Sequence, residues 1–175
     1  MIYQLKITSI ENIDFVRIIE IDADNTFADL HWCIQRCCGY SSDQLASFFT
    51  AGSNYGTQKE ITFLDFGRTS SQTEIMGKTT LQNILSEKGQ RLLYVFDFFN
   101  DRSFYIELTE IYMEKHLQEN KVAYKQGDAP AQVLEEELQG QGLEILNQEN
   151  RYQDYGDLDD YTEIFGEMED LIEGD

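Results

Sequence analysis

The strongest constraint on the fold is an apolar run at residues 91–98 that has no polar face. Along an extended chain its two faces are formed by Leu92, Tyr94 and Phe96 on one side and by Leu93 and Val95 on the other. A strand of this kind can be buried on both sides, so we expect it near the centre of a sheet. A turn at Asn100 and Asp101 follows, and residues 104–113 resume the alternation, which predicts an antiparallel pair.

A hairpin and a helix are predicted before this pair. Apolar residues alternate at positions 3–7, and a β-branched run follows at 15–21, which together predict two paired strands. Thr26 and Asp29 then stand three apart, the spacing of a capping box, and Gly39 supplies a C-terminal stop. Between these signals the apolar residues recur with helical period at Phe27, Leu30, Ile34 and Cys38.

The remaining elements of the first 130 residues are short. We expect strands at residues 44–50 and 60–66, a polar loop at 67–77 and a short helix at 80–87. Because strands and helices are segregated along the chain, the pattern favours an α+β fold over a parallel β-α-β array. We predict a mixed, mainly antiparallel sheet packed by the N-terminal helix, with acidic helices at the C-terminus. The expected core comprises Phe27, Leu30 and Ile34 on the helix and Leu5, Ile7, Tyr94, Phe96, Ile106 and Leu108 on the sheet.

The character of the chain changes near residue 130. Asp128 and Pro130 predict the start of another helix, which continues through Val133, Leu134 and Leu138. Fifteen acids and a single base, Arg151, lie in residues 135–175, a bias that keeps surface hydrated rather than building a core. We therefore divide the chain into an α+β domain at 1–130 and an acidic helical arm at 131–175.

The arm ends in a predicted amphipathic helix at about residues 160–173. Its apolar face, the candidate partner-binding surface, is formed by Tyr161, Ile164, Phe165, Met168 and Leu171. A stripe of this size is unusual on the surface of a soluble monomer, so we expect it to be covered. We favour docking back onto the chain's own domain, with capture by a basic partner or by a second copy as the alternative.

The charge of the chain limits its partners. With 33 acids against 13 bases, the net charge of −20 repels phosphate, so we expect no direct binding to nucleic acid. The field is compatible with a basic protein surface or a divalent cation, although such a charge also serves solubility alone. Hydrophobic residues still make up 41% of the chain, so most of it is expected to fold.

The cysteines and the hydropathy pattern predict a cytoplasmic protein. Cys33, Cys37 and Cys38 are three thiols within one predicted helix, a pattern that suits a reducing compartment better than a disulfide framework. No basic leader followed by an apolar run is found at the N-terminus, and no apolar stretch approaches the roughly 20 residues of a bilayer span. We expect no membrane association.

Several segments, in their order along the chain, resemble the Ri-plasmid ORF-three-like family, a bacterial and archaeal family of uncertain function. The matching pieces are the opening IYQLKIT, the helix TFADLHWCIQRCCGY, the turn Asn54-Tyr55-Gly56, the segment TTLQNIL, and Asp97-Phe98 followed by Asp101. The resemblance covers about residues 1–130.

The chain departs from this family at its polar positions. Family members usually carry an Asp-Phe-Gly-Asp run followed by Trp and His, and those places here hold Phe99, Asn100, Arg102 and Phe104. The family's polar or aromatic pair before Phe48 is replaced by Gln44 and Ala46, and its Pro-Pro-Glu-Asp and Cys-Gly-Gly signature is reduced to Gly127 and Pro130. The resemblance therefore implies that any metal or acid-base site of the family is impaired in this chain.

His31, Asp97 and Asp101 are the remaining candidates for a proton-transfer or metal site. A single histidine lacks the convergent ligands that such chemistry requires, and a partly buried helix histidine is the simpler interpretation. Cys33 and Cys37 lie four apart on the predicted helix, but no second Cys or His pair follows them, so a cysteine cluster in or near the core is favoured.

The sequence thus favours a non-enzymatic protein-interaction module without cofactor or bound metal. The partner is expected to be a protein, with a basic surface as one option, and no oligomeric state is assigned. Two alternatives stay open. One is a vestigial or atypical metal-assisted enzyme that uses His31, Asp97 and Asp101, and the other is an acidic mimic of nucleic acid that occupies a basic partner.

Overall fold

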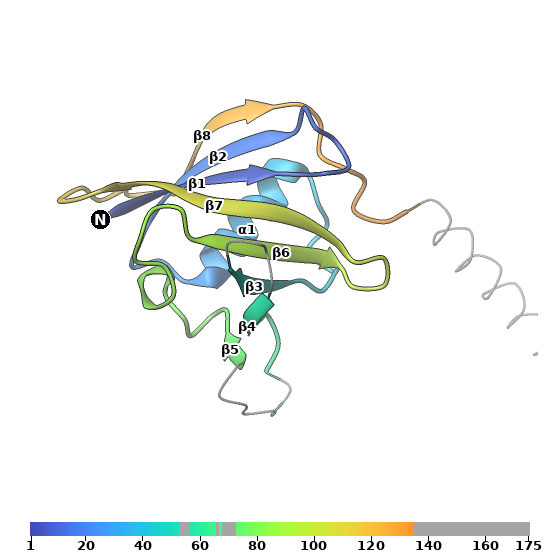
Figure 1. Ribbon diagram of the computed structural model, residues 1–175, viewed down its shortest axis with the longest axis horizontal. Helices are drawn as coiled ribbons and strands as arrows, with labels where there is room; N and C mark the ends of the chain where they lie inside the picture. Colours follow the sequence, from blue (N-terminus) through green and yellow to red (C-terminus); the bar gives the residue numbers. More distant parts are fainter. Residues whose placement is uncertain (53–56, 66, 68–72, 135–175) are drawn as a thin grey trace, which may run out of the picture. The chain divides into compact units, whose positions relative to one another are not determined.

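The computed structural model describes residues 1–52, 57–65, 67 and 73–134 (Figure 1). The chain divides into two compact units, Met1–Gln132 and Val133–Asp175, and the second lies almost entirely outside the described residues. The described residues of the chain form eight strands: β1 (Ile2–Thr8), β2 (Val16–Asp22), β3 (Ser47–Ala51), β4 (Thr57–Thr62), β5 (Thr73–Ile75), β6 (Arg91–Asp97), β7 (Arg102–Tyr112) and β8 (Lys121–Gln126), all in the first unit. Its helices within the described residues are α1 (Phe27–Cys38) and the short 3₁₀ helix η1 (Leu81–Asn83).

The strands form a single mixed sheet in the order β5-β4-β3-β6-β7-β1-β2-β8. The β4–β5 pair is parallel, and the other neighbours are antiparallel. The predicted N-terminal hairpin is β1–β2, with Leu5 opposite Ile19. The predicted pair at residues 91–113 is β6–β7, with Leu92 opposite Ile106. The mainly antiparallel sheet and its single long helix agree with the predicted α+β class.

Helix α1 begins and ends where the sequence signals place it. The Thr26 side chain accepts a hydrogen bond from the Asp29 N–H at 3.2 Å, and Asp29 Oδ2 accepts one from the Thr26 N–H at 2.8 Å. This reciprocal pair satisfies N–H groups that the first turn leaves without helical partners. At the other end Gly39 adopts a left-handed conformation with φ of 71°, which a residue without Cβ tolerates best.

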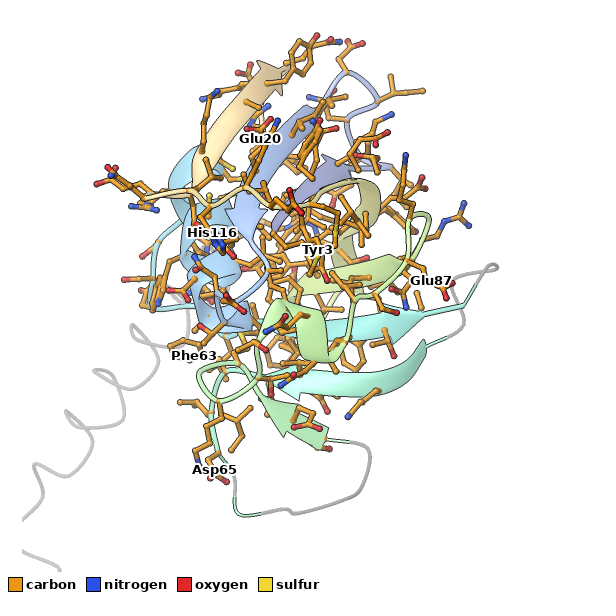
Figure 2. The ribbon with its side chains drawn as sticks, turned by 90° about the vertical axis from the view of Figure 1, so that its left-hand side faces the viewer. Tyr3, Glu20, Phe63, Asp65, Glu87 and His116 are labelled. Atoms are coloured by element: carbon orange, nitrogen blue, oxygen red, sulfur yellow. The ribbon has the colours of Figure 1, made fainter. Side chains whose placement is uncertain are left out.

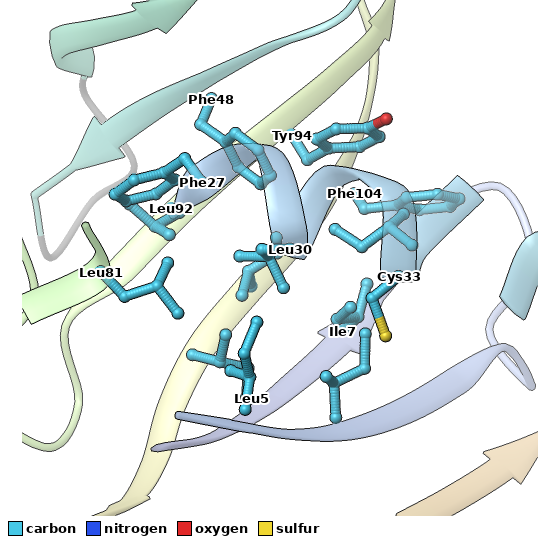
Figure 3. Close-up of a cluster of buried hydrophobic side chains, with 14 of the residues drawn as sticks. Leu5, Ile7, Phe27, Leu30, Cys33, Phe48, Leu81, Leu92, Tyr94 and Phe104 are labelled. Carbon is cyan, nitrogen blue, oxygen red and sulfur yellow. The ribbon is translucent and has the colours of Figure 1, made fainter. Parts of the chain in front are cut away.

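The predicted core is confirmed. Helix α1 lies against one face of the sheet, and Figure 3 shows Leu30 of the helix among Leu5, Ile7, Leu92 and Phe104 of the strands. Every residue of the expected core is buried, and Leu5, Ile7, Phe27, Leu30, Ile34, Tyr94, Ile106 and Leu108 have no exposed surface. Removal of this apolar area from water is the main driving force for folding of the unit.

Strand β6 is central in the sheet as predicted, but only one of its faces is fully buried. Leu92 and Tyr94 point into the core, whereas Leu93 and Val95 are half-buried. Within the described part of the chain, α1 covers the first of these faces (Figure 1). The sequence therefore overestimated the burial of the second face, on which Leu93 and Val95 remain half-buried.

Four local features differ from the sequence expectations. Residues 73–75, expected to be loop, form β5, and the expected helix at residues 80–87 is reduced to η1. The exposed edge strand β8 was not predicted, because its six residues show no buried alternate face. Residues 128–134 form no helix, contrary to the prediction from Asp128 and Pro130. The predicted final helix at about 160–173 lies outside the described residues.

The reason for the missing helix at 128–134 is tertiary hydrogen bonding. The Asp128 carbonyl accepts from Asn12 Nδ2 at 2.8 Å, and the Pro130 carbonyl accepts from the Tyr40 hydroxyl at 2.7 Å. The Ala131 carbonyl accepts from Arg102 Nη2 at 2.5 Å. These side chains take carbonyl oxygens that a helix would have used, so tertiary contacts override the local capping signal.

Candidate functional site

His31 lies in the interior between α1 and β6 and is only 2% exposed, deeper than the partly buried position expected from the sequence. Its Nδ1 is 2.9 Å from the Tyr94 hydroxyl, which also accepts a 2.6 Å hydrogen bond from Gln35 Nε2. We assign His31 Nδ1 as the acceptor, so that the Tyr94 hydroxyl donates to His31 while it accepts from Gln35. The imidazole also contacts the rings of Trp32 and Phe63.

This environment makes His31 a poor proton-transfer group. Burial lowers the pKa of His31 to about 4, so the imidazole is neutral near pH 7. Burial also raises the pKa of Tyr94, its hydrogen-bond partner. A histidine with this pKa and so little exposure does not exchange protons with a substrate near neutral pH.

Asp97 forms an ion pair with Arg102 rather than with His31. Arg102 Nη1 is 3.4 Å from Asp97 Oδ2, and Arg102 Nη2 is 2.9 Å from Glu11 Oε2. Burial would raise the pKa of Asp97, but hydrogen bonds from Asn100, Arg102 and the Phe99 N–H outweigh burial and hold it below its ordinary value. The Asp97 carboxylate therefore accepts hydrogen bonds from Asn100, Arg102 and the Phe99 N–H, which fix the turn and the ion pair.

Asp101 lies in the exposed turn between β6 and β7, with a positive φ of 52°. Its conformation is typical of a turn residue, since Asp tolerates the left-handed region better than most side chains. The hydrogen bonds of His31 and Asp97 involve neither each other nor Asp101. The three sequence candidates do not form a common site through direct contacts.

The position of the family's histidine is part of an aromatic cluster. Phe104, which stands there, is fully buried and stacks on Phe15 with ring centroids 4.9 Å apart. It also contacts Phe96 at 4.7 Å and Tyr40 at 5.9 Å. Phe99, in contrast, is 96% exposed in the turn. Of these two phenylalanines, Phe104 is thus part of the apolar core and Phe99 faces solvent.

Two buried arginines hold the segment after β8. Arg17 is 1% exposed, and its Nη1 donates to the carbonyls of Gln126 at 2.6 Å and Gly127 at 3.0 Å. Arg102 donates to the carbonyls of Ala131 and Gln132. Sequence reasoning did not single out Arg17, because a charged residue in an apolar strand gives no local sign of which distant carbonyls it will meet.

The cysteines line the C-terminal half of α1. Cys33 is buried, while Cys37 and Cys38 are half-buried and pack against the core, with their sulfurs 3.9 Å apart. The hydrogen bond with Cys38, together with the positive charges of Arg17 and Lys125, holds the pKa of Cys37 below its ordinary value. The core or near-core arrangement expected from the sequence agrees with these positions.

One group of potential metal ligands occurs among the described residues. Oxygen or nitrogen atoms of Asp22, Asp24 and His116 all lie within 4.8 Å of one another. No sequence motif signalled this group, because His116 is 94 positions away from Asp22 and reaches it only through the connection between β7 and β8.

Strand β8 provides an exposed sheet edge. It pairs with β2 on one side, and all six of its residues are exposed. Lys121 and Lys125 supply positive charge, while Val122 and Tyr124 are 38% and 47% exposed. Glu20, labelled in Figure 2, is opposite Lys121 in the β2–β8 register. No described helix is long and apolar enough to cross a membrane.

These features define an α+β protein in which α1 packs on a mixed sheet, with an aromatic cluster around Phe104 and an exposed edge strand that carries Lys121 and Lys125. The sequence profile described as plasmid pRiA4b ORF-3-like protein matches residues 1–166. The chain belongs to this family, and the match extends beyond the region of about 1–130 recognised from local motifs.

A solved structure shares the fold of this chain. The crystal structure titled protein of unknown function MM3350 from Methanosarcina mazei Go1 aligns with a TM-score of 0.51 and 23% sequence identity. The alignment covers 66% of this chain and 65% of that chain. No curated protein matches the sequence.

Proposed function

We propose that this chain is a non-enzymatic protein-interaction module that binds an extended, acidic segment of a protein partner along β8. The observation that carries this proposal is the exposure of all six residues of β8 at the edge of the sheet. The outer side of an edge strand presents backbone N–H and C=O groups that can pair with one more strand. The pairing would extend the sheet beyond β2 and β8.

The side chains of β8 favour an acidic partner. Lys121 and Lys125 give this edge a positive charge within a chain of net charge −20. Pairing with β8 of a second copy would bring lysines together, so charge disfavours self-association and favours an acidic strand. Val122 and Tyr124 provide exposed apolar contacts beside this edge.

The state of the family's polar position supports binding over catalysis. His31 is buried and neutral, and Asp97 is paired with Arg102. Phe104 fills the position of the family's histidine with an apolar ring. A metal-assisted enzyme built on His31, Asp97 and Asp101 would need these groups to face a common substrate, and their hydrogen bonds lead to other partners.

The acidic residues at 135–175 favour a second binding mode. Fifteen of the 33 acids lie there, which would steer a basic protein surface toward this part of the chain. Occupation of a basic nucleic-acid-binding partner is one form of this mode. We place either activity in the cytoplasm, in keeping with three free cysteines.

A charge-reversal experiment on the full chain tests the edge. The wild-type protein is used to capture partners from the native cell, beside Lys121→Glu/Lys125→Glu and a control with the same charge change, Lys6→Glu/Lys78→Glu. We expect the affinity of the β8 variant for the captured partner to fall by about tenfold or more, while the control variant keeps the affinity of the wild type. The purified partner should also slow amide exchange at residues 121–126.

Two results would contradict the edge proposal. Capture that is unchanged in the β8 variant excludes the edge as the binding surface. Capture that depends only on residues 135–175, tested with a chain truncated after Leu134, assigns binding to the acidic segment instead.

A further inference from the structure

The carboxylates of Asp22 and Asp24 and the imidazole of His116 converge at one end of the sheet. Asp22 ends β2, Asp24 lies in the turn before α1, and His116 comes from the connection between β7 and β8. His116 Nδ1 is 2.8 Å from Asp22 Oδ2, and potential ligand atoms of all three residues lie within 4.8 Å of one another. His116 is labelled in Figure 2 on the face toward the viewer.

The negative charge of this group has little compensation. Asp22 is 7% exposed; its Oδ2 is 2.8 Å from His116 Nδ1, and its Oδ1 is 3.8 Å from the α-amino group of Met1. Gln82 Nε2 donates to Asp24 Oδ1 at 2.6 Å, a contact that brings no charge. Within the described residues, no lysine or arginine ion pair is recorded for either aspartate.

The electrostatic state of Asp22 strengthens the case for a cation. Asp22 is largely buried, whereas Asp24 and His116 beside it are exposed. The group is thus a largely buried carboxylate beside a second carboxylate. A divalent ion would offset the charge of both carboxylates, most strongly that of Asp22, which water screens less than it screens Asp24.

The donor set selects the type of ion. The group offers one imidazole nitrogen and two carboxylate oxygens; zinc accepts both kinds of ligand, and zinc sites with three protein ligands hold water in the fourth position. Calcium prefers six to eight oxygen ligands, so this group is too small and too rich in nitrogen for it. We propose that Asp22, Asp24 and His116 form a binding site for a divalent zinc-type ion.

Such an ion would join two connections that are far apart in sequence. The Asn25 side chain donates to Asn120 Oδ1 at 2.8 Å, so these connections are already in contact beside the proposed ligands. Asn120 immediately precedes β8. Metal binding would therefore stabilise the start of the edge strand, but the metal site stands independently of the function proposed for that strand.

Calorimetric titration of the full chain with zinc sulfate, after removal of metals by a chelator, tests the site. We expect one site that is tighter than the diffuse binding of surface carboxylates. His116→Ala and Asp24→Asn should each weaken this site by about tenfold or more, and both residues are exposed, so the variants should fold. Glu119→Gln and Cys37→Ser serve as controls for nearby charge and for thiol ligation, and both should retain it.

Histidine ring NMR identifies the ligand directly, because the chain has two histidines. Zinc should shift the ring resonances of His116 and leave those of the buried His31 unchanged. Equal zinc affinity in wild type and His116→Ala would overturn the proposal, as would an unshifted His116 ring. Calcium that competes on equal terms with zinc would also overturn it, since that result marks a simple acidic cluster.

Discussion

The Tyr94 hydroxyl on β6 and Nδ1 of His31 on α1 are 2.9 Å apart inside the protein. The contact joins the helix to the central strand, and Gln35 Nε2 completes the chain by donating to the same hydroxyl. With Nδ1 assigned as the acceptor of the tyrosine proton, protonation of His31 would remove this acceptor and place a charge in the core. The structural role of His31 thus depends on its remaining neutral.

Stability should consequently fall on mild acidification. The pKa of His31 is about 4 in the folded protein, against 6.5 for an unperturbed histidine. Between these values the unfolded chain binds more protons, so the free energy of unfolding decreases as pH falls from about 6.5 toward 4. The loss attributable to His31 is about 3 kcal/mol. Urea unfolding of wild type and His31→Gln across this range measures it.

Comparison of these two proteins isolates the histidine. Carboxylates that titrate near the lower end of the range are present in both and cancel in the difference. The wild type should lose stability relative to His31→Gln as pH falls. Parallel stability curves for the two proteins would show that His31 is not held neutral by burial.

Arg102 should be required for stable attachment of the segment after β8. Its guanidinium bonds Glu11, Asp97 and the Ala131 carbonyl, and its side chain is 8% exposed. Arg102→Met would leave the buried Asp97 carboxylate without its cation, at a cost of about 3 kcal/mol. Chemical denaturation measures this loss, and amide exchange near residue 132 should accelerate.

A double-mutant cycle separates the ion pair from other effects of Arg102. Asp97→Asn removes the charge that Arg102 compensates, so Arg102→Met should cost less in that background. Identical costs in both backgrounds would mean that the other contacts of Arg102 dominate instead, namely those with Glu11, with the Ala131 carbonyl and with the Phe96 ring 5.0 Å away.

Leu30 tests the packing of α1 on the sheet. It has no exposed surface and lies at the centre of the core in Figure 3. Leu30→Ala should lower the free energy of unfolding by about 2 to 5 kcal/mol, because it leaves a cavity that the sheet cannot close. Arg36→Ala on the exposed side of the same helix should cost about 0.5 kcal/mol. Similar midpoints for both variants would be inconsistent with the assigned buried face.

The elements that could be predicted from sequence are those whose signals are local. The Thr26–Asp29 capping box and Gly39 located α1, and the alternation in β6 and β7 located the central pair. Strand β8 could not be found in this way, because its pairing with β2 leaves both of its faces exposed. An edge strand of this kind carries no alternation of buried and exposed residues.

The candidate sites were less predictable because they depend on distant contacts. Nothing near Asp128 indicates that Asn12 and Tyr40 will bind the carbonyls of its segment. Likewise, nothing near Asp22 indicates that His116 will approach it. Such arrangements follow from the sheet order, which local periodicity does not determine.

Gly127 provides a final test of how the segment after β8 is seated. Its φ is +65°, and a Cβ at this position would lie 2.6 Å from the Asp14 carbonyl oxygen and 3.0 Å from the Phe15 nitrogen. Gly39 has a similar φ of +71° but no atom within 4 Å of such a Cβ, so it is a matched control. Gly39→Ala should cost about 1 to 2 kcal/mol, the penalty of the left-handed conformation alone. Gly127→Ala should cost about 1 to 3 kcal/mol more, because backbone must move to admit the methyl group. Thermal and denaturant unfolding of the two variants measure this difference, and equal losses would show that the segment does not approach Asp14 closely in solution.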